Sequence, residues 1–181
     1  MNLSLLIILP LVFTIVALFV NEKQVRAVAL LASAVQLGLS IYLGLRFMQE
    51  RAVDKTEFLF RQNMEWFPSL GIGYHVGVDG ISVAMILLTA FVVLAGVLVS
   101  WNMQRMRKEY FFLLLFLSLG AYGFFISMDV FTLFFFLEVA VVPKFLLIGI
   151  WGSGKKEYSA MKLALMLTGA SALVFIGLAG L

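Results

Sequence analysis

Six stretches of this chain, each about twenty residues long, consist almost entirely of apolar side chains. A helix of about 20 residues spans the ~30 Å hydrocarbon core of a bilayer. The 181 residues are 63% hydrophobic and only 13% charged, whereas charged residues make up about 25% of an ordinary soluble domain. We therefore predict an all-α polytopic membrane protein with six transmembrane helices, which are Leu3–Val20, Ala27–Phe47, Ile81–Trp101, Tyr110–Met128, Val130–Trp151 and Met161–Leu181.

The two ends of the chain lead to different expectations about processing and completeness. No basic residue precedes Leu3, whereas a signal peptide begins with a positively charged region. We therefore expect the first apolar stretch to be retained as a helix. The last stretch runs to Leu181 with no polar flank, and we expect the chain to be the N-terminal fragment of a longer protein.

One loop, residues 48–80, is long enough to carry structure of its own. Over Glu57–Tyr74, aromatic and aliphatic residues alternate loosely with polar ones, and Pro68 and Gly71 interrupt the pattern. This favours a small β-hairpin that caps the outer face. An irregular interfacial loop is the alternative.

Basic residues in the loops predict the orientation, because they are enriched on the inner side of a membrane. With the N-terminus outside, eight Lys and Arg residues fall on the inner side and four on the outer side, where they are mixed with acidic residues. We therefore predict an outer N-terminus. The inner set is Lys23, Arg26, Arg105, Arg107, Lys108, Lys155, Lys156 and Lys162.

The composition also excludes several kinds of site. The chain has no cysteine and one histidine, His75, so it cannot supply an iron–sulfur cluster, a bis-His haem or a Cys/His zinc site. It lacks the G-x-x-x-x-G-K-[ST] phosphate loop. We expect no cofactor or metal on this chain. We expect no nucleic-acid partner, and a structural role for His75.

Glu138 is the residue that most needs an explanation. It lies eight residues into the predicted helix Val130–Trp151, about 12 Å from the outer end and near the membrane midplane. An acidic side chain at that depth costs at least ~2.5 kcal/mol and usually has a function. We predict that Glu138 takes up and releases protons in a relay. A carboxyl that only packs helices is the alternative.

Two residues that follow Glu138 could modify it. Pro143 cannot donate to the Val139 carbonyl, which leaves an acceptor one turn further in; membrane helices also tolerate ordinary prolines. Lys144 points about 120° away from Glu138 and ~9 Å further along the axis, so a direct salt bridge is not expected. Lys144 is either a tuning cation for Glu138 or a side chain that snorkels to the inner interface.

Three further charged residues lie near predicted helix starts. Asp79 and Asp129 directly precede apolar stretches, and both are expected to cap the free amides there. Lys162 lies at the inner start of the sixth helix and is either a positive-inside anchor or an inner entry point for protons.

Two long motifs resemble a known family. W-F-P-S-L-G-I-G-Y-H-V-G-V-D-G-I-S (Trp66–Ser82) and M-D-V-F-T-L-F-F-F-L-E-V-A-V-V-P-K-F-L-L-I-G-I-W-G (Met128–Gly152) resemble the antiporter-like subunit M (chain 4) of proton-pumping NADH–quinone oxidoreductase, respiratory complex I. The resemblance extends over essentially the whole chain. The second motif is also similar, less closely, to subunits of cation/proton antiporters.

The resemblance implies roles for matched residues. Glu138 matches the fifth-helix glutamate held to be essential for proton pumping, Pro143 matches the proline after it, and Asp79 falls in the V-D-G motif. The family glutamate modulates a lysine on a broken seventh helix, which lies beyond these 181 residues. Lys144 stands where many family members carry an uncharged residue.

The resemblance implies a proton-translocating subunit in an energy-coupling membrane, most simply a bacterial inner membrane. Its partners would be other membrane-arm subunits of the complex and the lipid bilayer. NADH, flavin, iron–sulfur clusters and quinone would be bound in other subunits of that complex. Residues 1–109 would form three N-terminal helices with loop 48–80, and residues 110–181 the start of a truncated antiporter-like domain. The alternatives are a cation/proton antiporter subunit and a membrane scaffold without transport.

Overall fold

The computed structural model describes residues 2–52, 58–67 and 72–179. These residues form six α-helices, one short 3₁₀ turn and a two-stranded sheet. In chain order the elements are α1 Leu5–Phe19, α2 Val25–Arg51, β1 Leu59–Phe67, β2 Ile72–Val78, α3 Gly80–Val99, η2 Ser100–Asn102, α4 Arg107–Ile126, α5 Val130–Trp151 and α6 Lys156–Ala179.

Five of these helices, α2 to α6, are long and apolar enough to cross a membrane. The sixth, α1, is apolar but has only 15 residues, about 22 Å at the usual rise. The chain is therefore an all-α polytopic membrane protein with a small sheet, as predicted. The predicted bounds of α5 agree with the structure, and α1 is shorter than the predicted Leu3–Val20.

Two helices begin three or more residues earlier than hydropathy predicts. Helix α4 starts at Arg107 rather than Tyr110, and α6 starts at Lys156 rather than Met161. The added residues are mostly charged, and a helix continues through such residues because its backbone hydrogen bonds do not depend on side-chain polarity. Hydropathy therefore marks the apolar part of each helix and misses its polar first turn.

The long loop forms the predicted β-hairpin, and the irregular alternative is wrong. Strands β1 and β2 pair antiparallel, with Asn63 opposite His75 and Met64 opposite Tyr74. Two irregularities interrupt the register, and Phe60 within the first has a positive φ of 57°. Pro68 and Gly71, which were expected to interrupt the segment, lie outside the described residues.

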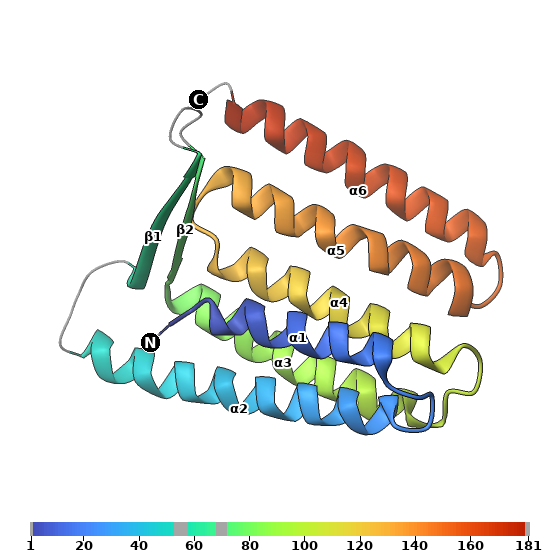
Figure 1. The fold of residues 1–181 in the computed structure, drawn as a ribbon. Coiled ribbons are helices and arrows are strands. Elements are labelled where there is room, and N and C mark those ends of the chain that lie inside the picture. Colours follow the sequence, from blue (N-terminus) through green and yellow to red (C-terminus); the bar gives the residue numbers. More distant parts are fainter. Residues whose placement is uncertain (1, 53–57, 68–71, 180–181) are drawn as a thin grey trace.

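The hairpin joins the first helix to the turn between α4 and α5. Ser4 Oγ donates to Gln62 Oε1 at 3.1 Å, and Tyr74 Oη donates to Ser4 Oγ at 3.4 Å. On the other side, Met128 N donates to His75 O at 2.9 Å and Thr132 Oγ1 donates to Gly73 O at 3.3 Å. The N-terminus, the hairpin and the α4–α5 turn therefore share one end of the helix bundle, which we call the hairpin end (Figure 1).

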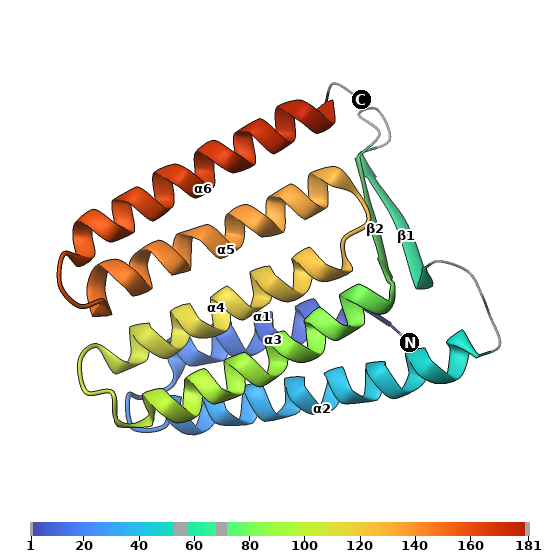
Figure 2. The same ribbon diagram turned by 180° about the vertical axis from the view of Figure 1, so that it is seen from behind.

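The remaining turns meet at the opposite end. Arg26 Nη2 donates to Met103 O at 3.3 Å, which joins the α1–α2 turn to the α3–α4 turn. Trp151 Nε1 donates to Arg105 O at 2.8 Å, which joins α5 to the same α3–α4 turn. Successive helices therefore run in opposite directions along the bundle, as Figures 1 and 2 show. We call this end the turn end.

Helices α1 to α4 form one group, and α5 and α6 extend it as a layer beside α4 (Figure 2). The core of the first group has two clusters. The cluster near the hairpin includes Leu43, Val76 and Tyr122, and the cluster near the turn end includes Ala29, Phe111 and Leu115. Helix α6 is mostly exposed, and only 11% of its apolar window is buried.

A proline in α1 is compensated by a side chain of α2. Pro10 has no N–H, so the Leu6 carbonyl loses its intrahelical partner. Gln36 Nε2 donates to Leu6 O at 3.2 Å in a buried position, and Thr14 Oγ1 donates to Pro10 O at 2.7 Å. The two helices are thus joined at the point where the proline would leave a buried acceptor without a partner.

Two glycines bring α4 and α5 close together. A Cβ added at Gly120 would lie 2.9 Å from the Cβ and backbone nitrogen of Ala140, and one added at Gly123 would overlap the Phe136 ring. Small residues allow membrane helices to approach closely. This contact determines how α5, and Glu138 with it, sits against the first group.

Candidate functional site

Glu138 lies midway along α5 and faces α6. Its Oε1 accepts a short hydrogen bond from Ser171 Oγ, and Ser171 is 3% exposed. Within the described part of α6, Ala160 and Ser171 are the buried residues, and their spacing of three turns puts them on one face. The α5–α6 contact is therefore built around this carboxyl–hydroxyl pair.

The hydroxyl of Ser171 can serve both protonation states of Glu138. Ser171 Oγ also lies 3.0 Å from the Thr168 carbonyl oxygen. The one hydrogen of the hydroxyl therefore has two possible acceptors, and its oxygen has two lone pairs. An ionised Glu138 accepts that hydrogen. A protonated Glu138 can instead donate to Ser171 Oγ while the serine hydrogen bonds to Thr168 O. The pair can therefore change its proton content without moving either helix.

An aromatic pair covers the hairpin side of Glu138. Phe134 and Phe175 lie one turn from Glu138 and Ser171, both toward the hairpin end, and their ring centroids are 5.0 Å apart. The two rings make the hairpin side of Glu138 apolar, although Phe175 is 41% exposed.

On the opposite side, Pro143 removes the amide that would bond to Val139 O. Helix α5 continues unbroken through Pro143. Among the described residues no side chain donates to Val139 O, whereas Gln36 compensates Pro10 in α1. An acceptor for water therefore lies next to Glu138 on the side of the turn end.

Lys144 faces a different helix. It lines a cavity of about 220 Å³ between α4 and α5 whose other lining residues, such as Phe124 and Leu137, are apolar or small. Within the described ranges Lys144 forms no ion pair, with Glu138 or any other residue, as the 120° separation on the helix predicts. The structure brings Glu138 together with Ser171 and does not bring Lys144 to them.

The other residues singled out from the sequence lie near the helix ends. Asp79 Oδ1 accepts from Ser82 N at 2.7 Å, and Asp129 Oδ2 accepts from Phe131 N at 3.0 Å and Thr132 N at 3.2 Å. Both aspartates therefore cap their helices, α3 and α5. The hydrogen bond from Ser82 holds the pKa of Asp79 below its usual range.

Lys162 and His75 lie away from Glu138. Lys162 is exposed on α6, six residues after its start, about 9 Å along the helix. The His75 ring nitrogen Nδ1 lies 3.2 Å from Asn63 Oδ1 on the neighbouring strand, and its backbone carbonyl binds Met128 N. Both of these contacts of His75 are structural.

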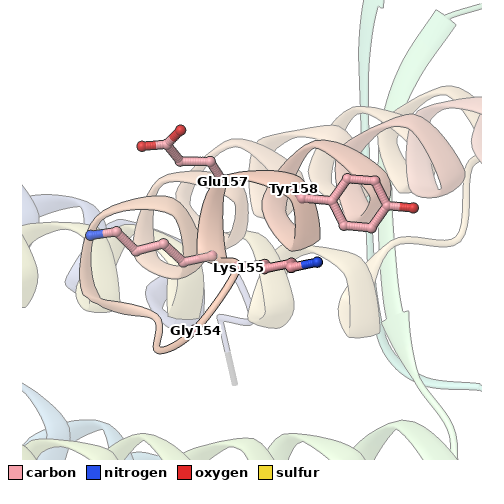
Figure 3. A pocket seen from close by; sticks show the side chains of 5 residues that line it. Gly154, Lys155, Glu157 and Tyr158 are labelled. Atoms are coloured by element: carbon pink, nitrogen blue, oxygen red, sulfur yellow. The ribbon is translucent and has the colours of Figure 1, made fainter.

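A pocket larger than the cavity at Lys144 lies away from Glu138. It has a volume of about 570 Å³ and lies at the α5–α6 turn, against Gly154, Lys155, Lys156, Glu157 and Tyr158. Figure 3 shows that the side chains of Lys155, Glu157 and Tyr158 point away from one another. Lys156 Nζ is engaged with Ile150 O at 2.8 Å. This pocket has no converging groups, so it is a surface hollow of the turn.

In the part of the chain that the structure describes, no three His, Asp or Glu side chains come together as metal ligands. The groups that meet at Glu138 are its carboxyl and the hydroxyl of Ser171.

Ser171 is the residue that sequence reasoning missed. A serine in an apolar helix commonly bonds back to its own backbone, so its presence alone carries no signal. Ser171 and Glu138 are 33 positions apart in the sequence, so no local pattern indicates that they are in contact. A helical-wheel argument that put Ala160 and Ser171 on one face could have indicated the α5-facing side.

Residues 127–181 match the protein family described as "NADH:quinone oxidoreductase/Mrp antiporter, TM". The chain is 32% identical to F(420)H(2) dehydrogenase subunit M of Methanosarcina mazei, over 98% of this chain and 36% of the relative. It is 31% identical to an NAD(P)H-quinone oxidoreductase chain 4 of Microcystis aeruginosa, over 99% of this chain and 32% of the relative. The chain thus spans about a third of the length of these curated relatives.

Two solved structures have the same fold. A chain of the archaeal membrane-bound sulfane sulfur reductase superposes with a TM-score of 0.76 at 18% identity, over 97% of this chain and 36% of that chain. A chain of respiratory complex I from Thermus thermophilus superposes with a TM-score of 0.70 at 22% identity, over 87% of this chain and 31% of that chain. At these identities the likeness concerns the fold alone.

Proposed function

We propose that this chain, which belongs to the NADH:quinone oxidoreductase/Mrp antiporter family, is the N-terminal part of a proton-translocating subunit M. Glu138 would load and release a proton as electrons pass to quinone elsewhere in the complex. The observation that carries this proposal is the carboxyl of Glu138 near the middle of the apolar helix α5, hydrogen-bonded to the buried hydroxyl of Ser171.

The energy for transport must come from outside this chain. Moving one charge against 100 mV costs about 2.3 kcal/mol, and no group described in this chain carries out redox chemistry. The relatives' names include both an F(420)H(2) dehydrogenase and NAD(P)H-quinone oxidoreductases. A membrane subunit of this type is thus compatible with more than one electron donor. NADH, with flavin and iron–sulfur clusters in partner subunits, is the donor we propose.

The orientation we propose has the hairpin end outside, in a bacterial inner membrane. The α1–α2, α3–α4 and α5–α6 turns meet at the turn end, and the basic residues of the predicted inner loops belong to these turns or to the helix starts beside them. Inner loops of membrane proteins are enriched in Lys and Arg. Proton entry near Lys162 is the corresponding proposal for the inner side.

The domain division also stays a prediction. We propose that residues 1–109 form an N-terminal unit and residues 110–181 begin the antiporter-like unit. The family match begins at residue 127, which favours a boundary near α4. Helix α4 packs against both α1 and α5, so it would be shared between the two units.

A cation/proton antiporter subunit is the second candidate, because the matched family is described for both kinds of complex. The two differ in what drives transport. Membrane vesicles that acidify on addition of an electron donor and quinone support the first function. Proton movement that requires only a sodium or potassium gradient supports the second.

The test is Glu138→Gln in the full-length protein within its complex. Glutamine keeps the size and the hydrogen-bonding reach of the side chain but cannot release a proton. We expect normal assembly and loss of proton translocation through this subunit. The control is Glu157→Gln, which changes an exposed glutamate on α6. Unchanged translocation in Glu138→Gln would leave the scaffold alternative as the better explanation.

A further inference from the structure

A second buried polar cluster lies apart from Glu138, among α1, α2 and α4. Within the described residues, most of the buried polar side chains belong to it. We call it the polar core: Thr14, Ser33, Gln36, Ser40, Ser118 and the hydroxyl of Tyr122. The proton relay proposed above makes no use of these groups.

Two atoms of the polar core have no hydrogen-bond partner. They are Gln36 Oε1 and Tyr122 Oη, and both are buried, with Gln36 3% and Tyr122 0% exposed. The nearby Ser40 hydroxyl donates to Gln36 O at 2.8 Å. Its lone pairs could accept from Tyr122, but the two hydroxyls do not meet hydrogen-bond geometry. Buried polar groups in folded proteins nearly always have a partner, either protein or ordered water.

The orientation of the Gln36 amide is determined by α1. Its Nε2 donates to the Leu6 carbonyl that Pro10 leaves free. The oxygen must then face the other way, and turning the amide over would leave two carbonyl oxygens against each other. The orphaned Oε1 is therefore a consequence of the proline in α1.

Both orphaned groups line the same small cavity. It measures about 10 Å³ and is bounded by polar residues of α2 and α4 together with Pro10, Ala32, Val93 and Leu115. That volume is about what a single water molecule requires. Ser33 and Ser118 also line the cavity. Ser33 Oγ donates to Leu30 O at 3.0 Å, and Ser118 Oγ donates to Leu115 O at 2.7 Å. Their oxygen lone pairs remain free to accept.

We propose that this cavity binds one water molecule that accepts a hydrogen bond from Tyr122 Oη and donates one to Gln36 Oε1. The second hydrogen of the water bonds to Ser33 Oγ or Ser118 Oγ. A buried water commonly makes about three hydrogen bonds, and this arrangement provides three. The water joins α2 to α4, while Gln36 joins α2 to α1. A cation is not expected here, because the lining residues include no carboxylate. An apolar molecule does not fit, because the cavity of about 10 Å³ is too small for one.

The test is a cryo-EM map of the complex with the full-length protein, at a resolution that reveals ordered water. We expect a density peak at about 2.7–3.2 Å from both Tyr122 Oη and Gln36 Oε1. In Tyr122→Phe the peak should be lost. In the control Tyr110→Phe it should remain, because Tyr110 Oη lies 2.7 Å from Ser100 Oγ and outside the polar core.

Two outcomes overturn the proposal. One is a wild-type map in which Tyr122 Oη and Gln36 Oε1 bond directly to each other. The other is a wild-type map with no peak in the cavity although waters of similar burial are visible elsewhere. If Tyr122→Phe does not assemble, the wild-type map alone decides. None of these outcomes depends on whether Glu138 carries protons.

Discussion

Replacing Gly120 with alanine tests whether the close contact between α4 and α5 determines the position of Glu138. The new Cβ would lie 2.9 Å from the Cβ and backbone nitrogen of Ala140 and 3.0 Å from its Cα. Ordinary contact begins at 3.4 Å, so α5 must move away by about 0.5 Å. Backbone atoms cannot rotate out of the way, and Ala140 is only two residues from Glu138.

The cost follows from two opposing effects. Inserting a methyl group into a packed contact typically costs about 1–3 kcal/mol. Replacing glycine by alanine inside a helix gains about 0.5–1 kcal/mol. We therefore expect a net loss of stability between about 0 and 2.5 kcal/mol, whereas an alanine without the close contact would gain stability. We also expect weaker proton translocation, because the displaced α5 changes the Glu138–Ser171 contact.

Gly38→Ala is the matched control, because a Cβ at Gly38 in α2 has no atom within 4 Å. It should keep or raise the melting temperature of the full-length protein, measured by thermal denaturation in detergent. Gly120→Ala should lower that temperature and reduce proton translocation in vesicles. If the two variants melted at the same temperature, the reasoning from helix contact would be refuted.

Three further predictions concern single side chains. Ser171→Ala should reduce proton translocation severalfold, because Glu138 loses its hydrogen-bond partner, and Ser171→Thr should restore it; equal activity of both variants would exclude a role for the hydroxyl. Lys144→Met should reduce vesicle proton translocation less than Glu138→Gln, because the two residues face different helices; an equal or larger loss would contradict this. Asp79→Ala should lower stability by about 1 kcal/mol at neutral pH through loss of the cap. Because the hydrogen bond from Ser82 lowers the pKa of Asp79 in the folded state, the cap contributes fully above about pH 4 and is lost as the pH falls further. The difference in melting temperature between wild type and Asp79→Ala should therefore shrink in acid, and a difference that grew would contradict the sign.

The bounds of some helices can be read from the sequence because polar residues stop the apolar pattern abruptly. Helix α5 is the clearest case, since Asp129 caps its start and Gly152 follows its end. The starts of α4 and α6 cannot be read in this way, because charged residues such as Lys108 and Glu157 continue the backbone hydrogen bonding beyond the membrane-facing segment.

Glu138 can be found from the sequence because an acid in an apolar helix is energetically costly. Its partner Ser171 cannot, because small polar residues occur widely in membrane helices without cost. The same holds for Gln36, whose contact with Leu6 depends on the packing of α1 against α2. Interactions between distant helices follow from tertiary structure, which no local pattern encodes.

The β-hairpin has a consequence for biosynthesis. Its strands are translated between the second and third spans, but Met128 N and Thr132 Oγ1, which hold β2 in place, belong to the turn before the fifth span and to its first residues. Neither hydrogen bond can form until the chain has been synthesised through Thr132. Unpaired strand edges promote association with other chains. Synthesis of the start of α5 is thus the step at which β2 gains these two partners.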